Sequence, residues 1–148
     1  MKIYLLDTNI ILYSLRSTDF HAKIVSDFAL YNAPNVSAIS VVTLGELQSI
    51  ALKNHWGEKR ISQMKEFLKN FLVIDIHQED LINAYALIDA FSQNRLTDRP
   101  LGETPRNMGK NDLWIAATAS VTTAILLTTD ADFNHLDTSF LEIKNILV

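Results

Sequence analysis

Short apolar runs alternate along the chain with longer stretches of helical periodicity, and this alternation constrains the fold more than any other feature. Runs of this kind are typical of parallel strands that are buried on both faces, and parallel strands need crossover connections, which are usually helices. The sequence therefore predicts an α/β fold, a three-layer sandwich with a central, mainly parallel sheet and helices on both faces. The predicted strands are 3–6, 36–39, 72–76, 124–127 and, at an edge, 140–146.

The clearest helical spacing follows Ser40, which is a good N-cap residue, and places Val41, Leu44, Leu47 and Ile50 on one side. Residues 92–111 have no periodicity and hold two of the three prolines, and a loop of that length in a compact protein is usually functional or disordered. The 148 residues contain no repeat and no linker, so we expect one domain over 1–148. Further helices are predicted at 9–15, 21–31, 58–71 and 79–91, and from residue 112 onward.

The composition excludes several classes of protein. Cysteine is absent, which excludes disulfides, zinc–thiolate sites, iron–sulfur clusters and a catalytic thiol. With 48% hydrophobic and 20% charged residues, the chain is typical of globular proteins rather than disordered ones. No apolar run approaches the roughly 18 residues of a membrane span, and Asp7 and Asn9 interrupt the apolar N-terminal stretch. We therefore expect a cytoplasmic protein with no membrane partner.

Four acidic residues stand out because of where the predicted elements place them. Asp7 and Asp130 each directly follow an apolar strand, Asp112 lies where the polar loop becomes a helix, and Glu46 lies inside the helix after the second strand. In an open parallel sheet, ligands bind beyond the carboxyl ends of the strands. The sequence therefore predicts that these four carboxylates face one crevice.

Each acid also has an ordinary structural interpretation. Asp7 and Asp130 are suited to capping helices, Asp112 to the positive end of a helix dipole, and Glu46 to an exposed helix face. Four carboxylates without matching Lys or Arg in their motifs would raise one another's pKa values, and Mg²⁺ or Mn²⁺ would remove that cost. Taken together, the four acids favour a metal site over four separate caps.

These motifs resemble the PIN domain and, within it, the VapC-type toxin ribonucleases. The resemblance spans the chain and rests on DTN after the first strand, the helical Glu, NDLWIAATA, and TTDADF at the last buried strand. It implies a Mg²⁺- or Mn²⁺-dependent endoribonuclease, the toxin of a type II toxin–antitoxin pair, with an antitoxin partner and a homodimer. It also implies in-line phosphodiester hydrolysis without a side-chain nucleophile, with the metal held by Asp7, Glu46, Asp112 and Asp130.

The last motif offers both Asp130 and Asp132, and we favour Asp130 because it directly follows the strand. Asp132 is then expected either to contact the metal-binding residues without binding the metal itself, or to cap a helix. In the resemblance, Thr8 fits the small polar position after the first acid, and Thr128 or Thr129 is a candidate to orient a water.

Binding of an RNA substrate requires positively charged side chains, and the net charge of −4 does not show where the chain carries them. The bases Lys53, Lys59, Arg60, Lys65 and Lys69 are interpreted as a solvated helix face. The bases of the polar loop are better candidates for RNA contact, because the loop leads directly to Asp112. They are Arg95, Arg99, Arg106 and Lys110.

Three aromatic residues, Trp56, Phe67 and Phe71, fit either a surface that binds a partner protein or the apolar core.

Two other classes of protein, haloacid-dehalogenase-like phosphatases and receiver domains, also place acids at strand ends. A dehalogenase-like phosphatase needs a second Asp at position 9, where this chain has Asn, and a receiver domain needs a Lys where residues 128–130 read Thr-Thr-Asp. A non-catalytic PIN-like module that binds RNA or protein remains the alternative, although the presence of all four acids argues against it.

Overall fold

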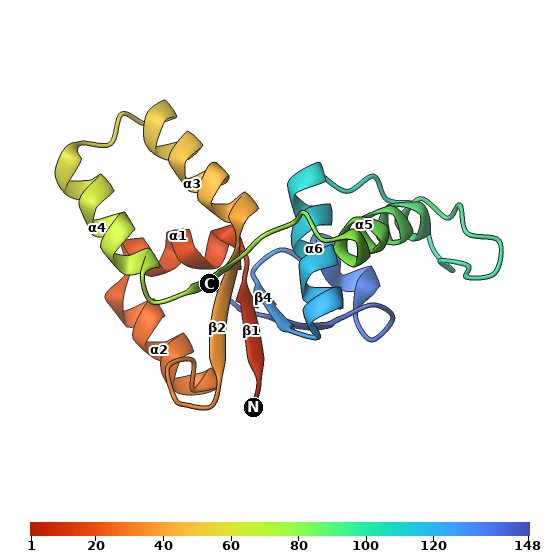
Figure 1. Cartoon of the computed structure of the whole chain (residues 1–148), viewed down its shortest axis with the longest axis horizontal. Helices are drawn as coiled ribbons and strands as arrows, with labels where there is room; N and C mark the ends of the chain where they lie inside the picture. Colours follow the sequence, from red (N-terminus) through yellow and green to blue (C-terminus); the bar gives the residue numbers. More distant parts are fainter.

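The computed structural model describes residues 1–148 and contains a five-stranded sheet in the order β3-β2-β1-β4-β5 (Figure 1). Every neighbouring pair of strands is parallel, so the predicted sheet is confirmed and is wholly rather than mainly parallel. The carboxyl ends of the strands therefore meet at one edge of the sheet. The strands are β1 (Ile3–Leu6), β2 (Val36–Ser40), β3 (Leu72–Ile74), β4 (Ile125–Thr128) and β5 (Glu142–Asn145).

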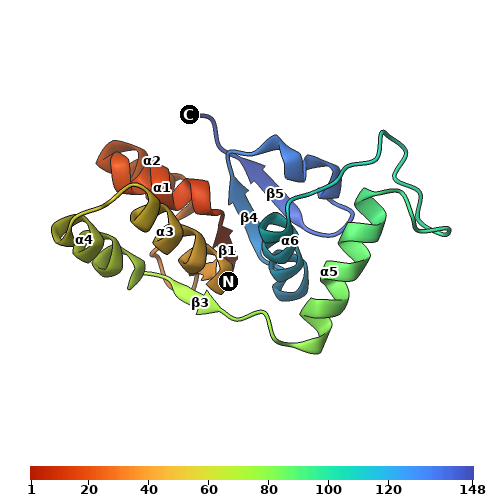
Figure 2. The same ribbon diagram turned by 90° about the horizontal axis from the view of Figure 1, so that it is seen from above.

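Helices cover both faces of the sheet, which confirms the predicted three layers. In Figure 2, α1–α4 lie on one side of the strands and α5 and α6 on the other. No helix is both long enough and apolar enough to cross a bilayer. The helices are α1 (Thr8–Arg16), α2 (Thr18–Phe28), α3 (Val41–Lys53), α4 (Glu58–Leu68), α5 (Glu79–Ser92), α6 (Lys110–Thr122) and the 3₁₀ helix η1 (Ala131–Leu136).

Two apolar cores form because side chains alternate between the faces of each strand. In β1, Tyr4 and Leu6 pack with residues of α1, α2, α3 and α4, whereas Leu5 packs with α5, α6 and η1. All three side chains are buried, and Leu5 and Leu6 are fully so. These three successive side chains can all be buried because helices cover both faces of the sheet.

Several element boundaries differ from the prediction because of local capping. The helix expected at 21–31 begins at Thr18, since the Ser17 hydroxyl accepts a hydrogen bond from Phe20 N, and it ends before Ala29, which is left-handed with φ 52°. The helix expected to begin at Asp112 begins at Lys110, with Gly109 as its N-cap. Asp112 therefore lies within the first turn of α6 rather than at its start.

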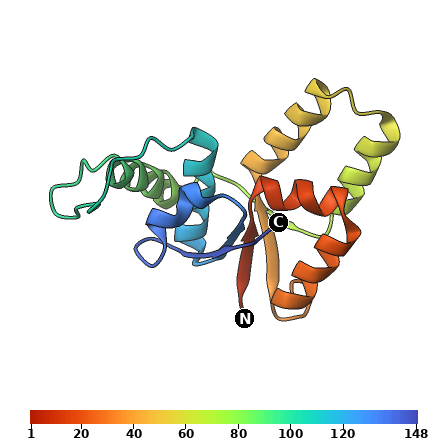
Figure 3. The ribbon, with the colours of Figure 1, turned by 180° about the vertical axis from the view of Figure 1, so that it is seen from behind.

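The aromatic residues near α4 belong to the core. Phe71 is 6% exposed, and Phe67 and Trp56 are partly exposed and pack against the same apolar cluster. Trp56 lies in the loop that connects α3 to α4, and the Arg60 guanidinium lies 3.9 Å above its ring. Figures 1 and 3 show this loop at the end of the α3–α4 pair that is farther from the sheet.

The polar loop, residues 93–109 in the structure, extends from the body of the molecule between α5 and α6 (Figure 2). It is held at two points, one near its middle and one near its C-terminal end. The Arg99 guanidinium lies 3.9 Å above the Phe140 ring and donates to the Ser139 carbonyl, and Arg106 N donates to the Ser92 carbonyl at 2.7 Å. The loop therefore reaches α6 along a defined path, and Arg99 has a structural role.

Candidate active site

Asp7 has two structural roles at the end of β1. Its carboxylate caps α1 by accepting a hydrogen bond from Thr8 N at 2.8 Å, and its second oxygen accepts one from the Thr128 hydroxyl at 2.7 Å. Only 4% of Asp7 is exposed. The cap interpretation of Asp7 is therefore correct, but the contact with β4 shows that the cap does not account for the whole side chain.

Thr128, the last residue of β4, connects Asp7 to Asp130. The Thr128 hydroxyl gives its proton to Asp7 and accepts a hydrogen bond from Asp130 N at 3.0 Å. Its one proton is therefore already donated, and the orientation of a water by Thr128 stays a prediction. Thr128 fixes the direction of Asp7 across two adjacent parallel strands.

Glu46 is held by a chain of hydroxyl groups from α1 and α3. The Thr8 hydroxyl donates to Glu46 Oε1 at 2.7 Å and lies 3.0 Å from the Thr43 hydroxyl. Because Thr8 has one hydroxyl proton, Thr43 is the donor in the second bond. Sequence analysis did not identify Thr43, although its position three residues before Glu46 on one helix face was the available signal.

Asp112 differs from the other three acids because its carboxylate accepts no hydrogen bond. It lies in the first turn of α6, and its pKa is raised to about 7, mainly by burial and then by repulsion from Asp7, Asp130, Glu46 and Asp132. A carboxylate with no donor and several acidic neighbours is costly to ionise. The cost indicates that Asp112 is placed for something other than stability.

The pKa of Asp7 is also raised, to about 6. Burial is the largest cause, and the charges of Glu46 and Asp130 add to it, while the hydrogen bonds from Thr128 and Thr8 N act in the opposite direction. No Lys or Arg forms an ion pair with any of the four predicted acids. Their mutual repulsion is therefore not compensated by any side-chain cation within ion-pair distance.

Asp130 and Asp132 have different surroundings. Asp130 follows β4, is partly exposed, and caps η1 by accepting a hydrogen bond from Asp132 N at 2.8 Å. The Asp132 side chain is exposed, and its backbone N–H is what holds Asp130. The preference for Asp130 over Asp132, two residues further along the chain, stays a prediction.

Glu46, Asp112 and Asp132 line a groove made of three connected cavities, whereas Asp7 and Asp130 line none of the three. The first, of about 530 Å³, lies between α3 and α6 and shares Glu46 and Asn111 with a second of about 320 Å³. The second shares Gly109 and Asp112 with a third of about 240 Å³, which reaches Asp132. The groove therefore runs from the middle of α3, past Glu46 and Asp112, to the start of η1.

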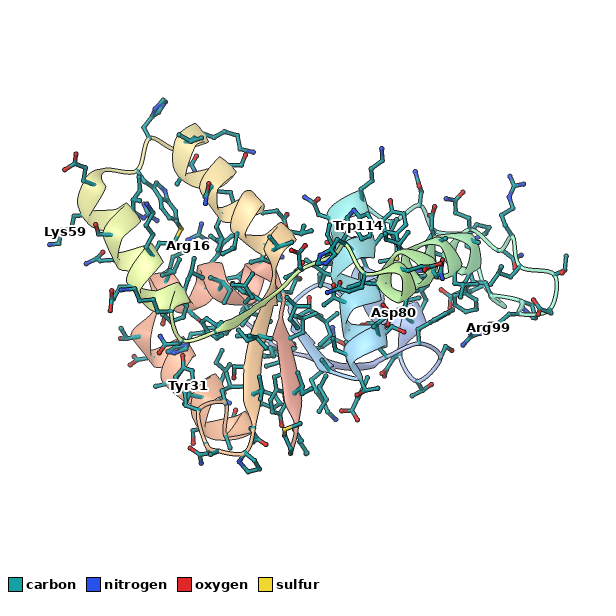
Figure 4. The ribbon with its side chains drawn as sticks, viewed as in Figure 1. Arg16, Tyr31, Lys59, Asp80, Arg99 and Trp114 are labelled. Atoms are coloured by element: carbon teal, nitrogen blue, oxygen red, sulfur yellow. The ribbon has the colours of Figure 1, made fainter.

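Three of the predicted bases line this groove and the others do not. Lys53 lies in the first cavity, Lys110 in the second and Arg106 in the third. Lys59 and Arg60 line a separate cavity beside Arg16 and Trp56, whose side of the molecule is visible in Figure 4. The groove thus combines the acids with cations that are spaced along it.

Across the whole chain, no three acidic or histidine side chains converge at metal-ligating spacing. The four carboxylates affect one another's charge, as the pKa of Asp112 shows, but they are not arranged around one common point. Their donor chemistry nevertheless fits a hard divalent cation, since all four are carboxylates and no thiolate or imidazole lies among them.

The contact between Thr128 and Asp7 leads to a testable prediction. Replacing Thr128 with valine removes a hydrogen bond that lowers the pKa of Asp7, so that pKa is expected to rise above about 6 in a carboxyl NMR titration. Any activity that depends on Asp7 is expected to fall about 10- to 100-fold. Thr128→Ser keeps the hydroxyl and serves as the control. An unchanged Asp7 pKa in Thr128→Val would contradict the role given to Thr128.

The fold and the site together define an α/β protein with carboxylates gathered beyond the carboxyl ends of a parallel sheet, beside a groove that also carries cations. The sequence model of the PIN domain matches residues 4–139, and the chain belongs to the PIN domain family. No curated protein matches the chain in sequence.

Three solved structures are similar over almost the whole chain. One is VapBC2 from Rickettsia felis bound to a DNA fragment from its promoter, with 26% identity, TM-score 0.72, and coverage of 97% of this chain and 98% of that one. The second is VapBC-1 from nontypeable Haemophilus influenzae, with 26% identity, TM-score 0.74, and 97% coverage of both chains. The third, DNA-bound VapBC from Salmonella typhimurium, has 21% identity, TM-score 0.75 and 98% coverage of both chains.

Proposed function

We propose that this protein is an endoribonuclease that hydrolyses RNA phosphodiester bonds with Mg²⁺ or Mn²⁺, and that it is the toxin of a type II toxin–antitoxin pair. The observation that carries the proposal is the half-buried Asp112, which accepts no hydrogen bond and whose pKa is raised to about 7 by burial and by four neighbouring acids. Membership of the PIN domain family and the likeness to VapBC structures support the same function.

Asp7, Glu46, Asp112 and Asp130 are the residues proposed to hold the cation. A bound Mg²⁺ or Mn²⁺ would supply positive charge where negative charge develops on the phosphodiester and would lower the pKa of a water. The carboxylates do not converge at metal-ligating spacing, and we expect them to move closer together when a cation neutralises the repulsion among them.

The chain's own residues orient and balance this site. Thr128 holds Asp7, and the Thr43–Thr8 hydroxyl pair holds Glu46, so two of the acids keep one direction before any ligand binds. Lys53 and Arg106 lie toward opposite ends of the groove and are placed to bind phosphates that flank the scissile one. Glu46 and Asp112, which line the groove, then face a backbone whose neighbouring phosphates are already held.

The proposed partners are an antitoxin and a second copy of the chain. The antitoxin is inferred from the VapBC structures from Rickettsia felis and Haemophilus influenzae, each 26% identical to this chain. An antitoxin segment that occupied the groove would exclude RNA from the four acids. The homodimer and the cytoplasmic location stay predictions.

The test is cleavage of a broad RNA panel with Mg²⁺, with Mn²⁺ and with EDTA. We expect cleavage with either metal, none with EDTA, and at least about a 100-fold loss in Asp7→Asn, since even residues behind metal ligands cost 10- to 100-fold. Asp80→Asn is the matched control, because Asp80 also accepts a hydrogen bond from the next backbone N–H, at 2.9 Å, but is exposed and outside the groove (Figure 4).

A non-catalytic PIN-like module is the second candidate, and one observation favours it. The carboxylates do not converge at metal-ligating spacing in this structure. If the wild-type protein binds RNA but leaves the whole panel intact with either metal, the nuclease proposal fails and the binding module replaces it. Slowed growth on expression that disappears in Asp7→Asn would instead support the toxin.

A further inference from the structure

The part of the groove between α3 and α6 has a chemistry that phosphate binding does not explain. This cavity of about 530 Å³ is lined by four apolar side chains, Val42 and Ile50 from α3, Trp114 from α6, and Ile76. Ser49, Lys53 and Asn111 supply polar groups in the same cavity. A phosphate needs only cations and donors, so the apolar lining indicates a ligand with a flat apolar part and polar edges.

Trp114 is the residue that gives this cavity its shape. It lies on α6, two residues after Asp112, and is partly exposed. Its ring centroid lies 4.2 Å from that of Tyr85 on α5, with 38° between the planes, so α5 supports the indole from one side. Figure 4 shows Trp114 at the top of α6, near α5. A supported aromatic ring that is open to a cavity is a stacking platform.

We propose that this cavity is a nucleobase subsite, in which a base of single-stranded RNA stacks on Trp114. Proteins recognise single-stranded RNA by stacking its bases on aromatic rings and by hydrogen bonds to the base edges, for which Ser49 and Asn111 are placed. Lys53 is in reach of the phosphate of the same nucleotide.

The subsite is continuous with the acids. Glu46 and Asn111 line both this cavity and the next one, which contains Asp112. A nucleotide stacked on Trp114 therefore has its backbone beside Glu46, and the adjoining phosphate lies toward Asp112. The subsite rests on the proposed function, and it assigns to Trp114 a part in choosing which base flanks the cleaved bond.

The chain has only two tryptophans, which makes the subsite directly measurable. In Trp56→Phe, the tryptophan fluorescence comes from Trp114 alone, and in Trp114→Phe the tryptophan fluorescence comes from Trp56 alone. We expect the four nucleoside 5′-monophosphates, titrated with EDTA present, to quench Trp114 with saturation and with different affinities. Ribose 5-phosphate, which has no base, should leave Trp114 unquenched, and Trp56 should respond to neither.

The second measurement is cleavage of a short RNA. Trp114→Leu is expected to lower kcat/KM about tenfold by raising KM, while Trp114→Phe, which keeps an aromatic ring against Tyr85, retains most of the activity. Melting curves of both variants show whether the loss reflects unfolding. An altered preference for the base beside the cleaved bond in Trp114→Phe would support the subsite directly.

The outcomes separate the subsite from the proposed function. If RNA is cleaved but no mononucleotide quenches Trp114, or if only Trp56 beside Arg60 responds, the subsite is overturned and the nuclease stands. If mononucleotides quench Trp114 but no RNA is cleaved, the subsite stands and the nuclease fails. Quenching by an apolar peptide and not by nucleotides would overturn the subsite in favour of a protein-binding groove.

Discussion

Asp112→Asn is expected to stabilise the protein at pH 8 in EDTA by about 2 kcal/mol and to reduce RNA cleavage at least about 100-fold. The two effects have one cause. Asp112 accepts no hydrogen bond, so the amide loses no contact, and it removes the charge that burial and four neighbouring acids make costly. The expected gain of about 2 kcal/mol is about half of what the full pKa shift of Asp112 would give, because water reaches part of this carboxyl and screens its charge.

The stability effect has a defined pH dependence. The pKa of Asp112 is about 7 in the folded protein and 3.8 in the unfolded chain, so the folded state binds more protons between these values. The ionised carboxylate therefore costs most above pH 7, and the cost declines as the pH falls to about 4. Wild type and Asp112→Asn are expected to differ at pH 8 and to converge near pH 4, as measured by urea unfolding.

Asp19→Asn is the control for this experiment. Asp19 also lies in the first turn of a helix, α2, but it is exposed and lies outside the groove. Its replacement is expected to lower stability slightly, because an acid near a helix N-terminus is favourable. If Asp112→Asn were less stable than wild type at pH 8, the conclusion that the ionised Asp112 carboxylate destabilises the folded protein would be wrong.

The affinity for Mn²⁺ is expected to fall about 1,000-fold from pH 8 to pH 5. A cation must displace protons from carboxylates whose pKa values are raised, to about 7 for Asp112 and about 6 for Asp7. Asp112 contributes about 100-fold and Asp7 about tenfold over this range. Titration calorimetry in two buffers of different ionisation enthalpy measures both the affinity and the protons released.

Asp112→Asn also separates the two contributions. In that variant the remaining pH dependence comes from Asp7, and it should be about tenfold or less over the same range. Mn²⁺ that binds equally well at pH 5 and pH 8 would show that the cation is not held by Asp7 and Asp112. That result would remove the metal site proposed here without affecting the fold.

Particular residues show how far sequence alone leads toward this site. Asp7 and Asp130 were recognisable because each follows an apolar run, and the parallel sheet does bring those two strand ends together. Thr128 was recognised only as a candidate to orient a water, because nothing in its own motif shows that its partner is Asp7, 121 residues away. Thr43 was not recognised because its contact with Thr8 depends on how α3 lies against α1.

By itself, the sequence determined the alternation of buried strands and helices, the wholly carboxylate character of the candidate site, and the order of its four acids. These depend on residue type and short-range periodicity, which a sequence contains directly. Only the tertiary structure decided which hydroxyl groups hold Asp7 and Glu46, that Asp112 has no donor, and that Trp114 lines a cavity continuous with Glu46. The physical reason is that hydrogen bonds, burial and cavities arise between elements distant in the chain, and these set the pKa values and shape of the groove.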